Sequence, residues 1–312
     1  MLQIRALIPH QTCDEVIKAI EADPATANLV VLRGVALRGQ GDLVLFDVAR
    51  ENINAIIAKL RALGVDTSGS IALLDRVTVL SDAAEAASIA AAGHPADAVV
   101  WDEIEDQAKE DAQLSWSFLS FLVLATLISS IGRYLDQPIL IIGAMVVGPE
   151  FAPIAAICLA IARRRGALFR PAIITLLGGF AIAAVITWLL WALANAAGLV
   201  DPVAATTGPA TGFIVQPDAW SFVIALLAGC AGVLSLTTAK SSALVGVFIS
   251  ITTVPALGAM GLTVAVGAWD EAWASLVQLA VNVAGIIVAG TATLVAQQLA
   301  SQTPRKERRP NL

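Results

Sequence analysis

The sequence predicts a polytopic α-helical membrane protein with six transmembrane helices and an N-terminal α+β domain, and three observations support this class. Hydrophobic residues make up 57% of the 312 residues, and the mean hydropathy is +0.79, as is typical of membrane proteins. Charge is unevenly spread, because residues 1–114 hold twenty-seven Asp, Glu, Lys and Arg residues and residues 115–300 hold twelve. The charge-poor part also contains six apolar segments that reach or nearly reach the ~20 residues a spanning helix needs.

The first 80 residues predict strands and helices in the order βαββαβ, which is typical of a ferredoxin-like sandwich. Thr12, with Glu15 three residues later, predicts a capping box at the start of the first helix, and Gly64 predicts the end of the second. We expect residues 1–80 to form a cytoplasmic domain that folds alone. The strands are expected at 2–8, 28–36, 43–48 and 70–80, and the helices at 12–21 and 50–63.

Residues 81–114 predict an acidic helical connector. A short helix over 82–92 ends at His94-Pro95, and seven acidic residues against one Lys follow from Asp97 to Asp111. Apolar residues at helical spacing in this run predict an amphipathic helix that leads into the membrane. We interpret its acidic residues as a solvated face, and a cation-attracting vestibule rim is the alternative.

Residues 115–300 form the predicted membrane domain. Basic residues gather in Arg163–Arg165 with Arg170, at Lys240 and in the tail 301–312, so the positive-inside rule places both termini in the cytoplasm. The N-terminus lacks the pattern of a cleaved signal peptide. We therefore expect a multi-pass protein of the bacterial inner membrane, with spans at 115–132, 138–162, 168–197, 219–237, 241–267 and 273–299.

The second segment contains the motif G-A-M-V-V-G-P-E-F-A-P-I at residues 143–154. Pro149 and Pro153 each remove a backbone donor, and the residues before them, Gly148 among them, are biased away from helical angles. Glu150 adds a carboxylate in mid-segment, and a charge at membrane depth persists only where protein or a water-filled cavity satisfies it. We expect an ion or substrate site here. The structural alternative is a kink that only shapes packing.

A weak internal repeat supports this interpretation. A shift of 102 residues places Pro153 on Pro255 and overlays the first three segments on the last three. Three spans per repeat would give an inverted 3+3 plan with broken helices near the midplane, the second of them carrying Thr252 and Thr253. Their oxygens beside the carboxylate favour a cation or proton, whereas exposed helix N-termini favour an anion if Glu150 is protonated. The predicted binding residues are Glu150, Gly148, Pro149, Pro153, Thr252, Thr253 and Pro255.

With a cytoplasmic domain, an acidic connector and this motif, the chain resembles the bacterial domain of unknown function 389 family over about 115–300. In many relatives the stretch is closer to G-A-M, two hydrophobic residues, S-P, a hydrophobic residue, x-G-P. Gly148 here replaces the Ser, and Glu150 and Ala152 replace an apolar residue and a Gly. The resemblance implies the fold, the location and the backbone break but no substrate, and Glu150 is a departure from the pattern.

These features predict a transporter or channel for a small ion or solute, with a cytoplasmic regulatory or assembly domain. The alternative is a membrane-anchored sensor or scaffold without transport activity. We expect no enzyme, because the membrane part has no His and no second carboxylate near Glu150, and the chain has no P-loop. The scattered cysteines indicate no metal or cofactor, and the few, dispersed basic residues indicate no nucleic acid. Small residues along the spans predict a homo-oligomer in the lipid bilayer.

Overall fold

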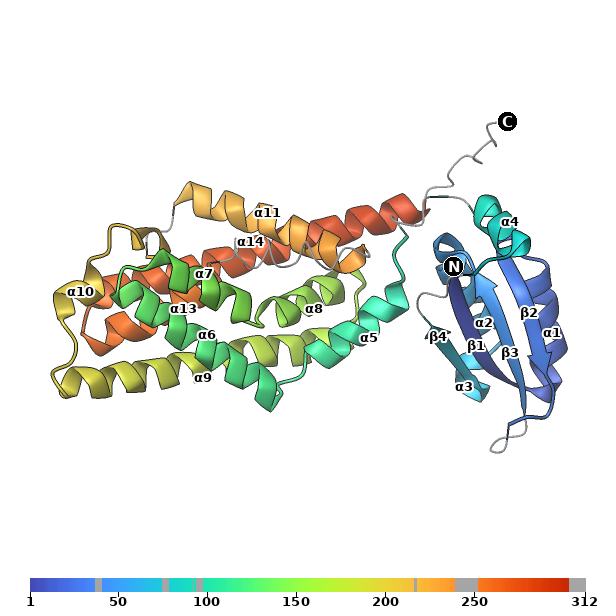
Figure 1. Ribbon diagram of the computed structural model, residues 1–312, viewed down its shortest axis with the longest axis horizontal. Coiled ribbons are helices and arrows are strands. Elements are labelled where there is room, and N and C mark those ends of the chain that lie inside the picture. Colours follow the sequence, from blue (N-terminus) through green and yellow to red (C-terminus); the bar gives the residue numbers. More distant parts are fainter. Residues whose placement is uncertain are drawn as a thin grey trace. The chain divides into compact units, whose positions relative to one another are not determined.

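The computed structural model describes residues 1–36, 41–74, 79–91, 93, 98–215, 218–238 and 252–302 (Figure 1). The chain forms two compact units, the first over Met1–Trp101 and the second over Asp102–Ala300. Each unit is described by itself.

The first unit contains a four-stranded antiparallel sheet in the order β2-β3-β1-β4. Alternate residues of β1 are buried, from Leu2 to Ile8, and they share one core with Val16 of α1 and Ile56 of α2, so both helices pack on the same face. This alternation is what a strand with one covered face requires. The elements are β1 (Leu2–Pro9), α1 (His10–Glu21), β2 (Thr26–Leu32), β3 (Gly41–Val48), α2 (Ile53–Ala62), α3 (Val65–Ser68), β4 (Ser70–Leu74) and α4 (Asp82–Ala90).

Two predicted helix ends in this unit have different outcomes. Gly64 follows α2 with a φ of 72°, which confirms it as the stop. The capping box at Thr12 is wrong, because α1 begins at His10 directly after Pro9 and the Thr12 hydroxyl donates to the Pro9 carbonyl at 3.3 Å. Strand β2 also begins and ends earlier than predicted, with a turn after Leu32, and His94-Pro95 lies outside the described residues.

The second unit is helical, and its described residues include four helices that are long and apolar enough to cross a membrane, or five if the bent pair α7–α8 is one span. The helix pair α7–α8 is bent by 53°. The predicted fifth span covers 241–267. Its residues 241–251 lie outside the described part of the chain, which resumes at Thr252, directly before α13. The helices are α5 (Trp101–Asp111), α6 (Trp116–Tyr134), α7 (Pro138–Val147), α8 (Phe151–Ala162), α9 (Gly166–Ala196), α10 (Pro202–Thr206), α11 (Ala219–Thr237), α13 (Thr253–Ala265) and α14 (Trp269–Gln302).

Polar contacts identify the two ends of this helical unit. At the connector end, the Glu105 carboxylate of α5 lies 2.7 Å from the Arg163 guanidinium, and the Thr175 hydroxyl near the start of α9 donates to the Ala112 carbonyl at 2.6 Å. At the far end, Arg133 near the end of α6 lies 3.8 Å from Glu271 near the start of α14. The long helices α6, α9, α11 and α14 therefore run between these ends.

Candidate functional site

The site begins at a break in the second apolar segment. Helix α7 ends at Val147 and α8 begins at Phe151, so Gly148, Pro149 and Glu150 form the link. The predicted break is present, but Pro149 alone causes it. Pro153 is the third residue of α8, a position where a helix loses no internal hydrogen bond. Although Pro153 removes the donor that would bond the Pro149 carbonyl in a continuous helix, that carbonyl is not left free, because it accepts from the Ala152 N–H at 3.2 Å.

Glu150 is the buried charge of this break, with an exposed fraction of 3%. Its Oε1 accepts a hydrogen bond from the Thr253 hydroxyl at 2.7 Å, and Thr253 is the first residue of α13. Its Oε2 has no hydrogen-bond partner among the residues that the structure describes. The two segments singled out in the sequence therefore meet at one carboxylate, 103 residues apart along the chain.

Gly148 provides the space for this carboxylate. A Cβ at residue 148 would lie 3.2 Å from the Glu150 Cδ and 2.8 Å from the Val254 Cγ2, and it would collide with the Glu150 Oε2. Because the backbone at Gly148 has a φ of −65°, the glycine is required by this close approach and not by its backbone angles.

Helix α14 adds a residue that the sequence analysis missed. The Asn282 amide donates to the hydroxyl of Thr252, the residue that precedes α13. Asn282 is 3% exposed, so it is an amide buried in an apolar span. Such a residue is costly in a membrane and usually functional, and this rule applied to segment 273–299 would have found it. Pro255 is, like Pro153, the third residue of its helix and shapes the helix start.

The carboxylate and the other oxygen atoms of this cluster are of the kind that can ligate a positively charged species. Glu150 immediately precedes α8 and contacts the first residue of α13, so the positive ends of two helix dipoles face one carboxylate and stabilise its negative charge. Carboxylate, hydroxyl and amide oxygens are hard ligands. Within the described part of the chain, no group of three or more His, Cys, Asp or Glu side chains is placed to hold a metal ion.

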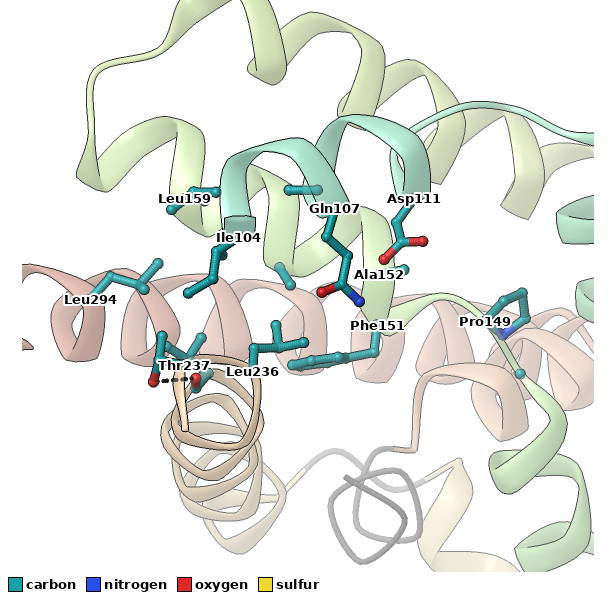
Figure 2. Close-up of a pocket in the computed structure, with 14 residues that line it drawn as sticks. Ile104, Gln107, Asp111, Pro149, Phe151, Ala152, Leu159, Leu236, Thr237 and Leu294 are labelled. Carbon is teal, nitrogen blue, oxygen red and sulfur yellow. Dashed lines mark hydrogen bonds between the residues drawn. The ribbon is translucent and has the colours of Figure 1, made fainter. Parts of the chain in front are cut away.

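A cavity of about 270 Å³ reaches the break from the connector side (Figure 2). Gly148 and Pro149 line it at the break, and the rest of its wall comes from α5, α8, α11 and α14. Figure 2 shows Ile104 and Gln107 of α5 facing Phe151 and Leu236 across this space. Burial, with the neighbouring Glu110 charge, raises the pKa of the Asp111 carboxyl, which also lines the cavity.

A second polar cluster closes the far end. Arg133 directly follows the predicted first span, 115–132, and was therefore expected in a loop, but it lies in the last turn of α6 and is 1% exposed. Its guanidinium donates to the Thr211 hydroxyl at 3.1 Å and the Thr206 carbonyl at 2.9 Å. The Thr211 hydroxyl also donates to Asp136 at 2.8 Å, and this bond holds the pKa of the Asp136 carboxyl below its usual value.

The fold and this site define a mostly helical protein with apolar helices of membrane-spanning length. Residues 145–288 match the family described as Domain of unknown function (DUF389), which confirms the predicted resemblance. The matched range contains Glu150, Thr252, Thr253 and Asn282.

A curated relative, an uncharacterized protein of Methanocaldococcus jannaschii, is 28% identical over 195 residues, which cover 61% of this chain and 58% of the relative. The chain thus spans less than two thirds of the relative's length. No solved structure matches the chain.

Proposed function

We propose that this chain is a transporter or channel that moves a small cation, the proton included, across the inner membrane, with Glu150 as the binding group. One observation carries the proposal: a carboxylate that is 3% exposed lies in a helix break and bonds to Thr253 at the start of a second short helix. Unwound backbone and helix ends that meet inside the bilayer are the usual construction of ion sites in secondary transporters. The cavity that reaches Gly148 and Pro149 supplies access from the connector side.

The helix positions support a 3+3 inverted repeat with six spans. Trp116 and Ala219, which begin α6 and α11, are 103 residues apart, and Gly166 and Trp269, which begin α9 and α14, are also 103 apart. Phe151 and Thr253 begin α8 and α13 and are 102 apart.

Two of these pairs also run in opposite directions. Helix α6 ends at the far end beside Glu271, whereas α11 ends at Thr237, whose hydroxyl accepts from the Gln297 amide near the end of α14 at 2.8 Å. Helix α9 begins at the connector end, where Thr175 donates to Ala112, whereas α14 begins at the far end. Opposite directions at a nearly constant offset are what an inverted repeat requires.

The remaining features of the proposal concern the first unit and the assembly. The order β2-β3-β1-β4, with both helices packed on one face, supports a ferredoxin-like domain. Arg163 lies at the connector end, which supports a cytoplasmic position for that end under the positive-inside rule. We include a regulatory role for this domain, a homo-oligomeric assembly and the absence of enzymatic activity in the proposal.

The test is ion flux in proteoliposomes, with protons, Na⁺, K⁺ and small anions compared for the wild type and Glu150→Gln. The variant keeps the shape and the acceptor for Thr253 but removes the charge, so we expect cation flux to be largely lost. Glu103→Gln, an exposed carboxylate on α5, is the matched control and should retain the flux. A Glu150→Gln protein that assembles normally and keeps the wild-type rate, ion preference and pH dependence would overturn the proposal. Absence of flux for every ion in the wild type would favour the sensor or scaffold instead.

A further inference from the structure

Helix α14 carries a polar face that is turned into the protein. Glu271, Ser275, Gln278 and Asn282 recur at intervals of four, three and four residues, so they lie on one side of the helix. Ser275 is 0% exposed, Gln278 1% and Asn282 3%, whereas Leu276 and Ala280 on the other side are exposed. In a spanning helix, a buried polar side indicates either polar contacts that hold helices together or a route for a polar species.

The hydrogen bonds distinguish these two roles. Glu271 Oε2 lies 3.8 Å from the Arg133 guanidinium, and the Ser275 hydroxyl donates to the Glu271 carbonyl at 2.8 Å. Gln278 Oε1, in contrast, is buried and has no hydrogen-bond partner within the described residues, as is also true of Glu150 Oε2. Polar residues that serve only packing are normally paired, because a buried unpaired group costs about 1–3 kcal/mol. An unpaired buried oxygen midway along a polar face is instead typical of a group that water or a ligand satisfies.

The polar face joins the two clusters already described. At one end, Asn282 donates to Thr252, the neighbour of the residue that bonds Glu150. At the other end, Glu271 lies 3.8 Å from the Arg133 guanidinium. The eleven steps along the helix from Glu271 to Asn282 rise about 16 Å, which is about half of a ~30 Å hydrocarbon core. The face therefore has the length needed to connect a mid-membrane site with one surface.

We propose that the Glu271–Ser275–Gln278–Asn282 face of α14 is the wall of the path along which a small cation or proton passes between Glu150 and the far end. This inference rests on the proposed function and adds the route. The far cluster contributes one positive side chain, Arg133, and two negative ones, Asp136 and Glu271, a net charge of −1 that favours cations at the mouth. Hydroxyl and amide oxygens along the wall suit the same species.

Cysteine accessibility tests the route without knowledge of the transported ion. In a chain with Cys13, Cys158 and Cys230 replaced by Ala, we would introduce Ser275→Cys and Gln278→Cys, with Ala280→Cys as the matched control on the exposed side of the same turns. The membranes are treated under an ion gradient with membrane-impermeant methanethiosulfonates added at the far end. Residues 275 and 278 should react and residue 280 should not, and the cationic reagent should react about tenfold faster than an anionic one of equal size. Unreactive thiols at both 275 and 278 that label fully after denaturation would overturn the route.

A flux measurement separates this inference from the proposed function. Gln278→Leu removes the amide but keeps a side chain of similar bulk, so it should reduce the cation flux. Leu276→Ala, on the exposed side of the helix, should leave the flux unchanged. If Glu150→Gln abolishes flux but Gln278→Leu leaves it unchanged and residue 278 does not label, the route is wrong and the proposed function stands. If residues 275 and 278 label as expected but Glu150→Gln changes nothing, the aqueous route stands and the proposed role of Glu150 fails.

Discussion

Replacement of Gly148 by Ala should disrupt the site through the Glu150 side chain and not through the backbone. The φ of −65° and ψ of 129° at Gly148 are allowed for alanine, so the substitution adds no backbone strain. The new methyl group would lie 2.8 Å from the Val254 Cγ2, 3.2 Å from the Glu150 Cδ and in collision with the Glu150 Oε2. The carboxylate must therefore move away from the Thr253 hydroxyl.

The free-energy cost of Gly148→Ala depends on whether Glu150 moves, and each case has its own magnitude. If nothing moves, the extra methyl overpacks a buried position, which costs about 1–3 kcal/mol. If Glu150 moves, the structure instead loses a hydrogen bond to a charged group, which is worth about 1.5–3 kcal/mol. In the first case the folded state, and in the second the intact Glu150–Thr253 pair, becomes less populated by a factor between about 5 and 150.

The apparent melting temperature in detergent and the cation flux in proteoliposomes measure this effect. Gly143→Ala is a close control in the same segment, because no atom lies within 4 Å of a Cβ at residue 143. That change should leave flux unaltered and raise stability slightly, since alanine is favoured over glycine inside a helix by about 0.5–1 kcal/mol. If Gly148→Ala matched Gly143→Ala in both stability and flux, the steric account of the site would be refuted.

Three further predictions concern the far end and the packing of the spans. Arg133→Met should lower the apparent melting temperature. The Thr206 carbonyl loses its hydrogen-bond donor and Glu271 loses its positively charged partner, at a cost of about 1–3 kcal/mol. The pKa of Asp136 is lowered by the Thr211 hydrogen bond, so its contribution to stability is present above the ordinary value of 3.8 and is lost as the pH falls through the lower, folded value. Wild-type protein should therefore lose more stability than Asp136→Asn on acidification in this range. Cys158 is fully buried, so maleimide should label Cys230 before Cys158 in folded protein and both equally after denaturation.

The elements that the sequence predicted well are those set by local pattern. The break between α7 and α8 could be found because Gly148 and Pro149 adjoin within an apolar run, and the end of α2 because Gly64 takes a positive φ. The start of α1 was misplaced because Pro9, at the end of a strand, leads directly into the helix and makes the side-chain cap at Thr12 unnecessary. Local sequence rules therefore predicted that helix α1 exists but misplaced its first residues.

Contacts between distant segments were harder to predict. The approach of Glu150 to Thr253 was anticipated only because an internal repeat placed their two segments at matching positions, and the repeat did not indicate which threonine would bond the carboxylate. No repeat pointed to Asn282, whose partner Thr252 lies 30 residues away, directly before α13. Arg133 resembled a loop residue because it lies near the end of an apolar segment, and its burial results from a segment more than 70 residues later that folds over it.

In the proposed function, the Glu150 side chain sets the sign of the charge that the site accepts. Two helices begin at this point, and the positive ends of their dipoles would attract an anion if no charged group stood between them. Family members with an apolar residue at this position, as the resemblance implies, would present such a field. In the proposed function, the Glu150 carboxylate supplies the negative charge, and its Oε2, which has no hydrogen-bond partner among the described residues, is the atom that we expect to bind a cation. We therefore expect the same backbone break to favour opposite charges according to one residue, which makes the neutral, equally sized Glu150→Gln variant the most informative single change in the chain.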